Sequence, residues 1–185
     1  MSETSRVGPG QVLHFWFDEL AEADWWRKDD ALDRRIATRF GAVLEAAARC
    51  ELSAWRTTAR GRLAEVLVLD QFSRNVHRGS AAAFANDALA LALAQEAVAH
   101  GCDRELAPRE RAFLYLPWMH SESRTIHEEA LRLFAQPGLE HNLEFERQHK
   151  AIIDRFGRYP HRNAALGRAS TPEELTFLRE PGSGF

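Results

Sequence analysis

An acid and a base continue the apolar face of a predicted helix in the sequence DQFSRN, residues 70–75. Asp70 and Arg74 follow Leu63 and Leu67 at spacings of three and four residues, so all four share one side of a helix. The pair is therefore expected to be partly buried, with Asn75 beside it. It is either the polar part of a binding site or a salt bridge that ties core helices together.

A second polar group, PWMHSE at residues 117–122, follows a proline-containing segment. His120 is a candidate general base, and Glu122 is a candidate partner for it. Alternatively, Ser121 is the N-cap of the next helix and Glu122 interacts favourably with the dipole of that helix. The sequence leaves both interpretations open.

A basic segment near the C-terminus contains the loop GRYPHRN, residues 157–163. Gly157 and Pro160 are explained by the end of a helix, but His161, Arg162 and Asn163 are not required for it. Residues 155–168 contain no acid and four arginines, at positions 155, 158, 162 and 168. Some of this charge complements a helix C-terminus, and Arg158, Arg162 and Arg168 are candidates for binding an anion.

Motifs for metals and common cofactors are missing from the sequence. His127 begins HEEAL, which lacks the second histidine of a zinc helix. Glu146 and His149 form a single Glu-x-x-His, whereas a di-iron bundle requires two. No serine nucleophile elbow, glycine-rich phosphate loop or dinucleotide fingerprint occurs. We predict no metal and no cofactor, and retain His149 as a candidate ligand-binding residue.

Composition predicts one compact domain over residues 1–185, since the chain has 185 residues of which 45% are apolar. A formal net charge of −3 gives no general attraction for nucleic acid or an anionic membrane. We find no secretory signal and no membrane-spanning apolar run, so we expect a soluble, cytoplasmic protein.

Helical periodicity predicts the elements that position these residues. The expected helices cover residues 9–20, 29–50, 60–77, 86–101, 108–117, 122–135 and 139–156, with a short one after Thr171. Asn86 and Thr171 are expected N-caps, the latter in a capping box with Glu174, and Pro117 is expected to interrupt its helix. Seven to nine helices without a strand predict an all-α fold.

The motifs together resemble the proteins grouped as domain of unknown function 924. The resemblance covers about residues 12–178 and is carried, in order, by FWF, WWRKD, RGRL, LDQFSRN, HSE, RFGRYPHRN, LGR and STPEE. It implies a tetratricopeptide-like fold, in which antiparallel helix pairs stack in a right-handed superhelix. It implies no reaction, because the family has no assigned biochemical function. The chain departs from the family pattern at Glu65, Ser73, His77 and His127.

Three functions remain open at this stage. The first is a binding scaffold for a small anionic ligand or an acidic peptide, which uses Asp70, Arg74, His120 and the C-terminal arginines. The second is a hydrolase or lyase acting on a phosphorylated or carboxylated substrate, with His120 or His161 as acid or base and Asp70 or Glu122 orienting it. In the third, the polar residues only hold helices together.

Overall fold

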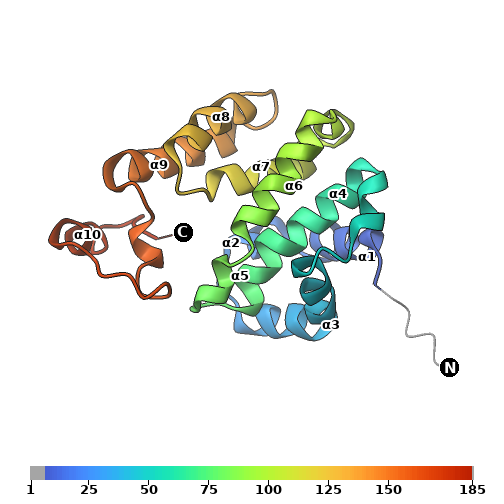
Figure 1. The fold of residues 1–185 in the computed structure, drawn as a ribbon, viewed down its shortest axis with the longest axis horizontal. Coiled ribbons are helices and arrows are strands. Elements are labelled where there is room, and N and C mark those ends of the chain that lie inside the picture. The colour runs from blue at the N-terminus through green and yellow to red at the C-terminus, as the bar shows by residue number, and fades with distance from the viewer. Residues whose placement is uncertain (1–6, 185) are drawn as a thin grey trace.

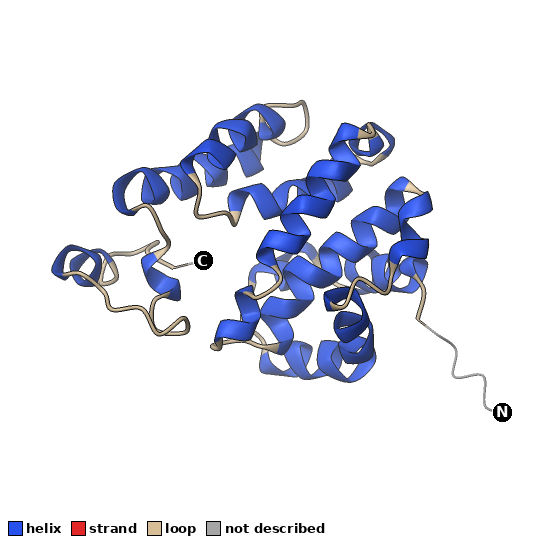
Figure 2. Ribbon diagram, viewed as in Figure 1, coloured by secondary structure: helices blue, strands red, loops and turns tan. Residues whose placement is uncertain are grey.

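The computed structural model describes residues 7–184, which form helices joined by loops, with no β-strand in that range (Figure 2). The all-α prediction is confirmed. The first half of the described chain consists of α1 (Pro9–His14), the π-helix η1 (Phe15–Glu19), α2 (Glu22–Trp26), α3 (Asp30–Ala48), η2 (Ser53–Thr57), α4 (Ala59–Leu67), the π-helix η3 (Val68–Phe72), α5 (Ser73–Val76) and η4 (Ala81–Phe84). The second half consists of α6 (Asp87–Ala99), η5 (Cys102–Glu105), α7 (Pro108–Met119), α8 (Arg124–Phe134), α9 (Glu140–Phe156), η6 (Pro160–Arg162) and α10 (Pro172–Phe177).

The helices form a larger body and a smaller arm (Figure 1). In the body, α4 contacts α1, α6 and α7, and α3 packs against η3 and α5. The arm begins where α8 packs on α7, continues with α9 beside α8, and ends with α10 at the far side from α1 (Figure 1). Successive helices from α6 to α9 thus pack against their neighbours, while the right-handed superhelix stays a prediction.

Aromatic side chains fill the centre of the body. Phe15, Trp16 and Phe17 are consecutive and all buried, so η1 is surrounded by protein on several sides. The ring of Phe40 on α3 lies 4.9 Å from Phe15 and 5.0 Å from Phe72 on η3. Apolar residues recur every three or four positions along α3, and those at Leu32, Ile36, Phe40, Val43 and Ala47 are all buried.

Asp70 lies in an irregular helix, and His120 directly follows a helix that contains a proline. The helix predicted at 60–77 contains the π-helix η3, which holds Asp70. Pro117 does not interrupt α7, contrary to our prediction, because the helix continues to Met119. The proline removes one backbone hydrogen bond near the end of a helix that is buried along most of its length, so side-chain packing offsets the loss.

Some of the expected helix caps are present and others are not. Thr171 and Glu174 form the predicted capping box, and Gly157 ends α9 as predicted, in the left-handed conformation with φ of 70°. Ser121 is not an N-cap, because α8 begins at Arg124 and Ser123 occupies the cap position. Asn86 is at the N-cap position of α6, but its side chain donates to Ser73 Oγ instead of capping.

No helix in residues 7–184 has both the length and the apolar character needed to cross a bilayer.

Gly61 is expected to be essential for packing α4 against η2. A Cβ atom at this position would lie 1.9 Å from the Trp55 carbonyl oxygen, which is backbone and cannot move aside easily. We expect Gly61→Ala to lower the free energy of unfolding by roughly 2 kcal/mol or more, measured by chemical denaturation. Gly41→Ala is the matched control, since nothing lies within 4 Å of that position in α3, and it should stabilise the protein by about 0.5–1 kcal/mol. Equal effects of the two substitutions would contradict the close contact.

Candidate functional site

A buried carboxylate meets a histidine where η3 approaches the end of α7. Asp70 is 1% exposed, and its Oδ1 atom accepts a hydrogen bond of 2.7 Å from His120 Nδ1. Its Oδ2 atom accepts from Gln71 Nε2 at 2.6 Å, and Arg74 NH1 lies 3.2 Å from Oδ1. Because Asp70 holds the Nδ1 proton, the Nε2 atom of a neutral His120 carries the lone pair. The His120 side chain is 15% exposed, so this imidazole remains within reach of solvent.

Two arginines share the carboxylate of Asp87 at the start of α6. Arg74 donates to both oxygens of Asp87, at 2.8 and 3.0 Å, and Arg162 donates to Oδ2 at 3.2 Å. Arg162 also donates to the backbone oxygen of His120 at 2.9 Å. Both guanidinium groups lie over the ring of Phe84, at 5.7 Å for Arg74 and 4.7 Å for Arg162. The body and the C-terminal arm are therefore joined next to the Asp70–His120 pair.

Tyr159 lies at the centre of the arm side of this site. Its ring is 5.8 Å from the ring of His149 and 5.5 Å from that of His161, and the guanidinium of Arg162 lies over it at 4.6 Å. The Tyr159 hydroxyl donates to the Met119 backbone oxygen at 2.5 Å. His149 Nδ1 donates to the Phe145 backbone oxygen, which leaves Nε2 as the basic nitrogen of a neutral ring.

The local charges favour an ionised Asp70 next to a neutral His120. Burial by itself would raise the pKa of Asp70, but Arg74 and His120 outweigh burial and hold that pKa far below its usual range. Burial lowers the pKa of His120, and Arg74 lowers it further, although Asp70 opposes both effects. The pair is thus carboxylate and neutral imidazole near pH 7.

The other two histidines of the site are also neutral near pH 7. Burial lowers the pKa of His149 to about 3. Burial and the neighbouring Arg162 lower the pKa of His161 to about 4. Burial and the repulsion of Arg74 lower the pKa of Arg162, which shows that two positive charges have been brought close together.

A second polar network holds the C-terminal loop and meets these contacts at the backbone of Tyr159. Glu122 accepts from Arg168 at 2.7 and 2.9 Å and from the backbone N–H of Tyr159 at 2.7 Å. Arg168 also donates to the side chain of Asn163 at 3.0 Å. Arg158 donates to the buried Glu174 at 2.6 and 2.9 Å. In this structure the C-terminal loop is therefore held in place by contacts of Glu122, Arg158, Asn163 and Arg168.

Asn75 faces another part of the molecule. Its side chain donates to Asp33 on α3 at 2.8 Å, and Arg78 binds the same carboxylate at 2.6 and 2.8 Å. Adjacent residues on a helix point about 100° apart, so Arg74 reaches Asp70 and Asp87 while Asn75 reaches Asp33 on α3. The structure brings together Asp70, Arg74, His120, His149, His161 and Arg162 from the predicted set.

Glu146 on α9 forms a fully buried pair with His127 on α8. His127 Nδ1 lies 2.6 Å from Glu146 Oε1, and both side chains are 0% exposed. His127 Nε2 lies 2.8 Å from the Ser121 backbone oxygen and therefore donates a proton to it. Burial raises the pKa of Glu146, which favours a protonated acid that donates to Nδ1. The pair links α8 to α9, and the hydrogen bond from His127 to Ser121 links α8 to the segment that follows α7.

Sequence reasoning missed three residues that complete the site: Asp87, Tyr159 and Phe84. Asp87 looks like an ordinary acid in the first turn of a helix, and Phe84 like a core residue. Tyr159 had a usable signal, because it lies inside the loop GRYPHRN that already contained the unexplained polar residues. Among the residues that the structure describes, no three histidine, cysteine or acidic side chains are placed to hold a metal ion.

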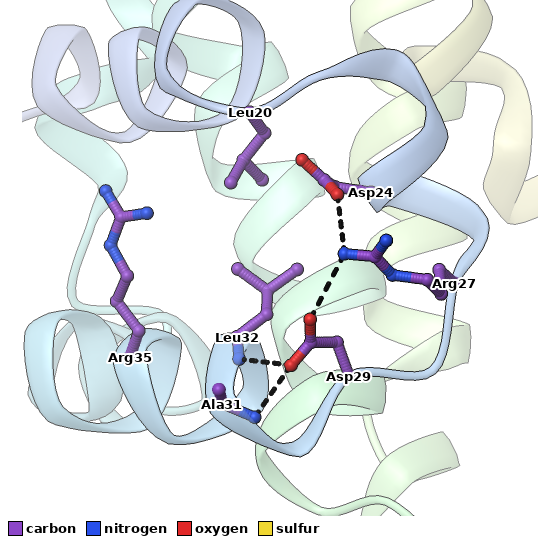
Figure 3. A pocket seen from close by; sticks show the side chains of 7 residues that line it. All are labelled: Leu20, Asp24, Arg27, Asp29, Ala31, Leu32 and Arg35. Carbon is purple, nitrogen blue, oxygen red and sulfur yellow. Dashed lines mark hydrogen bonds and ion pairs between the residues drawn. The ribbon is translucent and has the colours of Figure 1, made fainter.

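A shallow pocket of about 240 Å³ lies elsewhere, between α2 and α3 (Figure 3). Three of its charged groups pair with one another: Arg27 donates to Asp24 at 2.9 Å and to Asp29 at 3.2 Å. Asp29 also accepts from the backbone N–H groups of Ala31 and Leu32, and so caps α3. The pocket therefore lies at the N-terminal end of α3, where Asp29 caps the helix and pairs with Arg27.

The comparisons agree with the motifs found in the sequence. The model of a family described as bacterial protein of unknown function (DUF924) matches residues 12–182, which confirms the resemblance. A solved structure of a protein of unknown function from Agrobacterium tumefaciens is 38% identical to this chain, with a TM-score of 0.85. The match covers 92% of this chain and 96% of that chain. A search of curated proteins finds no significant match.

The neutral histidines should make the protein less stable in mild acid. Unfolding exposes His149, whose pKa of about 3 returns to about 6.5, so the unfolded chain binds a proton that the folded protein does not. The free energy of unfolding should therefore rise with pH between about pH 4.5 and 6, by about 1.4 kcal/mol per pH unit for this residue. We expect His149→Gln to reduce that slope in urea titrations.

The slope isolates the histidine even if the substitution changes absolute stability. Glu146 has a raised pKa and acts in the opposite direction, but it is present in both proteins. His100→Gln is the matched control, because His100 is 59% exposed and lies outside the site. An unchanged slope in His149→Gln would show that His149 is not buried in its neutral form.

Proposed function

Because the chain belongs to a family of bacterial proteins of unknown function, DUF924, we propose its function from the chemistry of the polar site. The protein binds a small anionic ligand, such as a phosphate or carboxylate compound, next to Arg74, His120, His161 and Arg162. We call these residues, together with Asp70, Asp87, His149 and Tyr159, the polar site. Their partial burial favours a small ligand over an extended acidic peptide, since the side chains of His120, Arg74 and Arg162 are only 15%, 19% and 7% exposed.

One observation carries this proposal: two guanidinium groups converge on a single carboxylate. Arg74 and Arg162 both bind Asp87, and their mutual repulsion contributes to the lowered pKa of Arg162. The buried Nε atom of Arg162 has no hydrogen-bond partner among residues 7–184. A bound anion would reduce the repulsion and supply acceptors in a partly desolvated site, where charge-assisted hydrogen bonds are strong.

Substitution of either shared arginine should weaken anion binding. We expect Arg162→Gln and Arg74→Gln each to weaken the binding of phosphate or citrate by about tenfold or more, measured by isothermal titration calorimetry. Arg155→Gln is the matched control, because Arg155 is 46% exposed and pairs with an exposed glutamate, Glu173. Circular dichroism would establish that each variant is folded. Equal affinities in all four proteins, or no binding to the parent protein, would contradict the proposal.

A second candidate function is acid–base catalysis at the same site. The specific observation in its favour is the Asp70–His120 hydrogen bond of 2.7 Å, which directs the Nδ1 proton to a buried carboxylate. This arrangement leaves Nε2 to accept a proton from a water molecule or a substrate hydroxyl, while Arg74 and Arg162 stabilise negative charge. The substrates would be phosphorylated or carboxylated compounds, and the reaction would be hydrolysis.

Catalysis predicts turnover that depends on a neutral His120. In a panel of phosphate and carboxylate esters, hydrolysis should rise with pH through the lowered pKa of His120 and then level off near neutral pH. His120→Gln should lower kcat by about 10²- to 10⁴-fold. Asp70→Asn should also lower kcat, because its amide can favour the wrong tautomer of His120. Turnover in none of the esters above that of His120→Gln would contradict this candidate and leave the binding proposal standing.

A further inference from the structure

Formal charges in the polar site balance before any ligand enters. Arg74 and Arg162 contribute two positive charges, while Asp70 and Asp87 contribute two negative charges. His120 is neutral because burial and Arg74 disfavour its charged form. An added anion would leave the site with excess negative charge in surroundings that solvent screens poorly. This excess must be offset within the site.

His120 is surrounded by charged and titratable groups from several elements. On the body side, Asp70 lies on η3, Arg74 on α5 and Asp87 on α6. On the arm side, His149 of α9 and His161 of η6 are close enough to interact electrostatically with it, and Arg162 binds its backbone oxygen. Burial and the positive charge of Arg74 keep the imidazole neutral, so an anion that compensates Arg74 removes the main electrostatic obstacle to its protonation.

Resting on the proposed anion site, we infer that an anion enters the polar site together with one proton, which His120 accepts at Nε2. The proton comes from solvent, the Nε2 lone pair forms the new N–H bond, and no bond of the anion is broken. The resulting imidazolium keeps its Nδ1 hydrogen bond to Asp70 at 2.7 Å and gains an Nε2 donor for the ligand. The net charge of the site then returns to zero for a monoanion.

Asp70 makes His120 the acceptor in preference to its neighbours. The carboxylate already touches His120, so an ion pair forms without any side-chain movement. His149 instead donates its Nδ1 proton to a neutral backbone oxygen, that of Phe145. His161 lies beside the positive charge of Arg162, which opposes protonation. The buried acid thus selects the histidine that responds to the ligand.

Sulfate is a suitable probe because it carries no proton of its own near neutral pH. Calorimetry of sulfate binding at about pH 7, in two buffers with different heats of ionisation, would measure the number of protons taken up. We expect a value approaching one, and an affinity that falls by up to about tenfold for each unit of rising pH. His120→Gln should bind sulfate more weakly and with almost no proton uptake, because it lacks the Nε2 donor, whereas His100→Gln should behave like the parent protein.

The outcomes separate this inference from the proposal on which it rests. No sulfate or phosphate binding between about pH 5.5 and 8 would overturn the anion site itself, and this inference with it. Sulfate binding with the same heat in both buffers would overturn only the proton uptake. Uptake that persists in His120→Gln and disappears in His161→Gln would overturn the assignment to His120. The buffer comparison uses the parent protein, so it decides the coupling even if His120→Gln does not fold.

Discussion

The burial of the Asp70 carboxylate is the constraint from which the rest of the polar site follows. Removing an ionised carboxylate from water costs several kcal/mol unless charged and hydrogen-bonding partners replace the water. Asp70 meets this requirement with Gln71, Arg74 and His120. These contacts fix the end of α7 against η3 and determine which nitrogen of His120 is protonated. The same interaction therefore stabilises the fold and prepares the imidazole chemically.

The chain of ion pairs continues from Asp70 into the C-terminal arm. Arg74 contacts both Asp70 and Asp87, and Asp87 in turn binds Arg162 of η6. The guanidinium of Arg162 lies over the ring of Tyr159, and the Tyr159 hydroxyl donates to the backbone oxygen of Met119 at the end of α7. Body and arm are thus joined through ion pairs in which Arg74 contacts two carboxylates and two arginines share Asp87. The structural and ligand-binding interpretations do not exclude each other, since residues that join helices through ion pairs can also be the residues that bind an anion.

Part of the backbone irregularity lies near the same contacts. Asp70 lies in a π-helix, and His120 follows a helix that tolerates Pro117 near its end. Single-turn π-helical segments cost stability relative to a regular helix and occur often at functional sites. The large aromatic core around Phe15, Phe40 and Phe72 provides the packing free energy that maintains the irregular segment.

The accuracy of the sequence-based predictions differed with the range of the interaction. Helix type and position followed from local periodicity, and the Asp70–Arg74 pair followed from spacing along one helix face. Ser121 was a candidate N-cap because it satisfies the local rule, but Ser123 satisfies the same rule and occupies the cap position of α8. Asn75 was grouped with Arg74 because they are adjacent in sequence, although adjacent residues on a helix face different neighbours.

By itself, the sequence determined the all-α class, the family and the residue types from which an anion site could be made. Only the tertiary structure decided that Arg158 and Arg168 pair with Glu174 and Glu122, while Arg74 and Arg162 meet at Asp87. The physical reason is that helix formation depends on residues a few positions apart. Charge pairing depends instead on side chains from distant segments, whose burial and mutual distances exist only once the body and the arm have packed together.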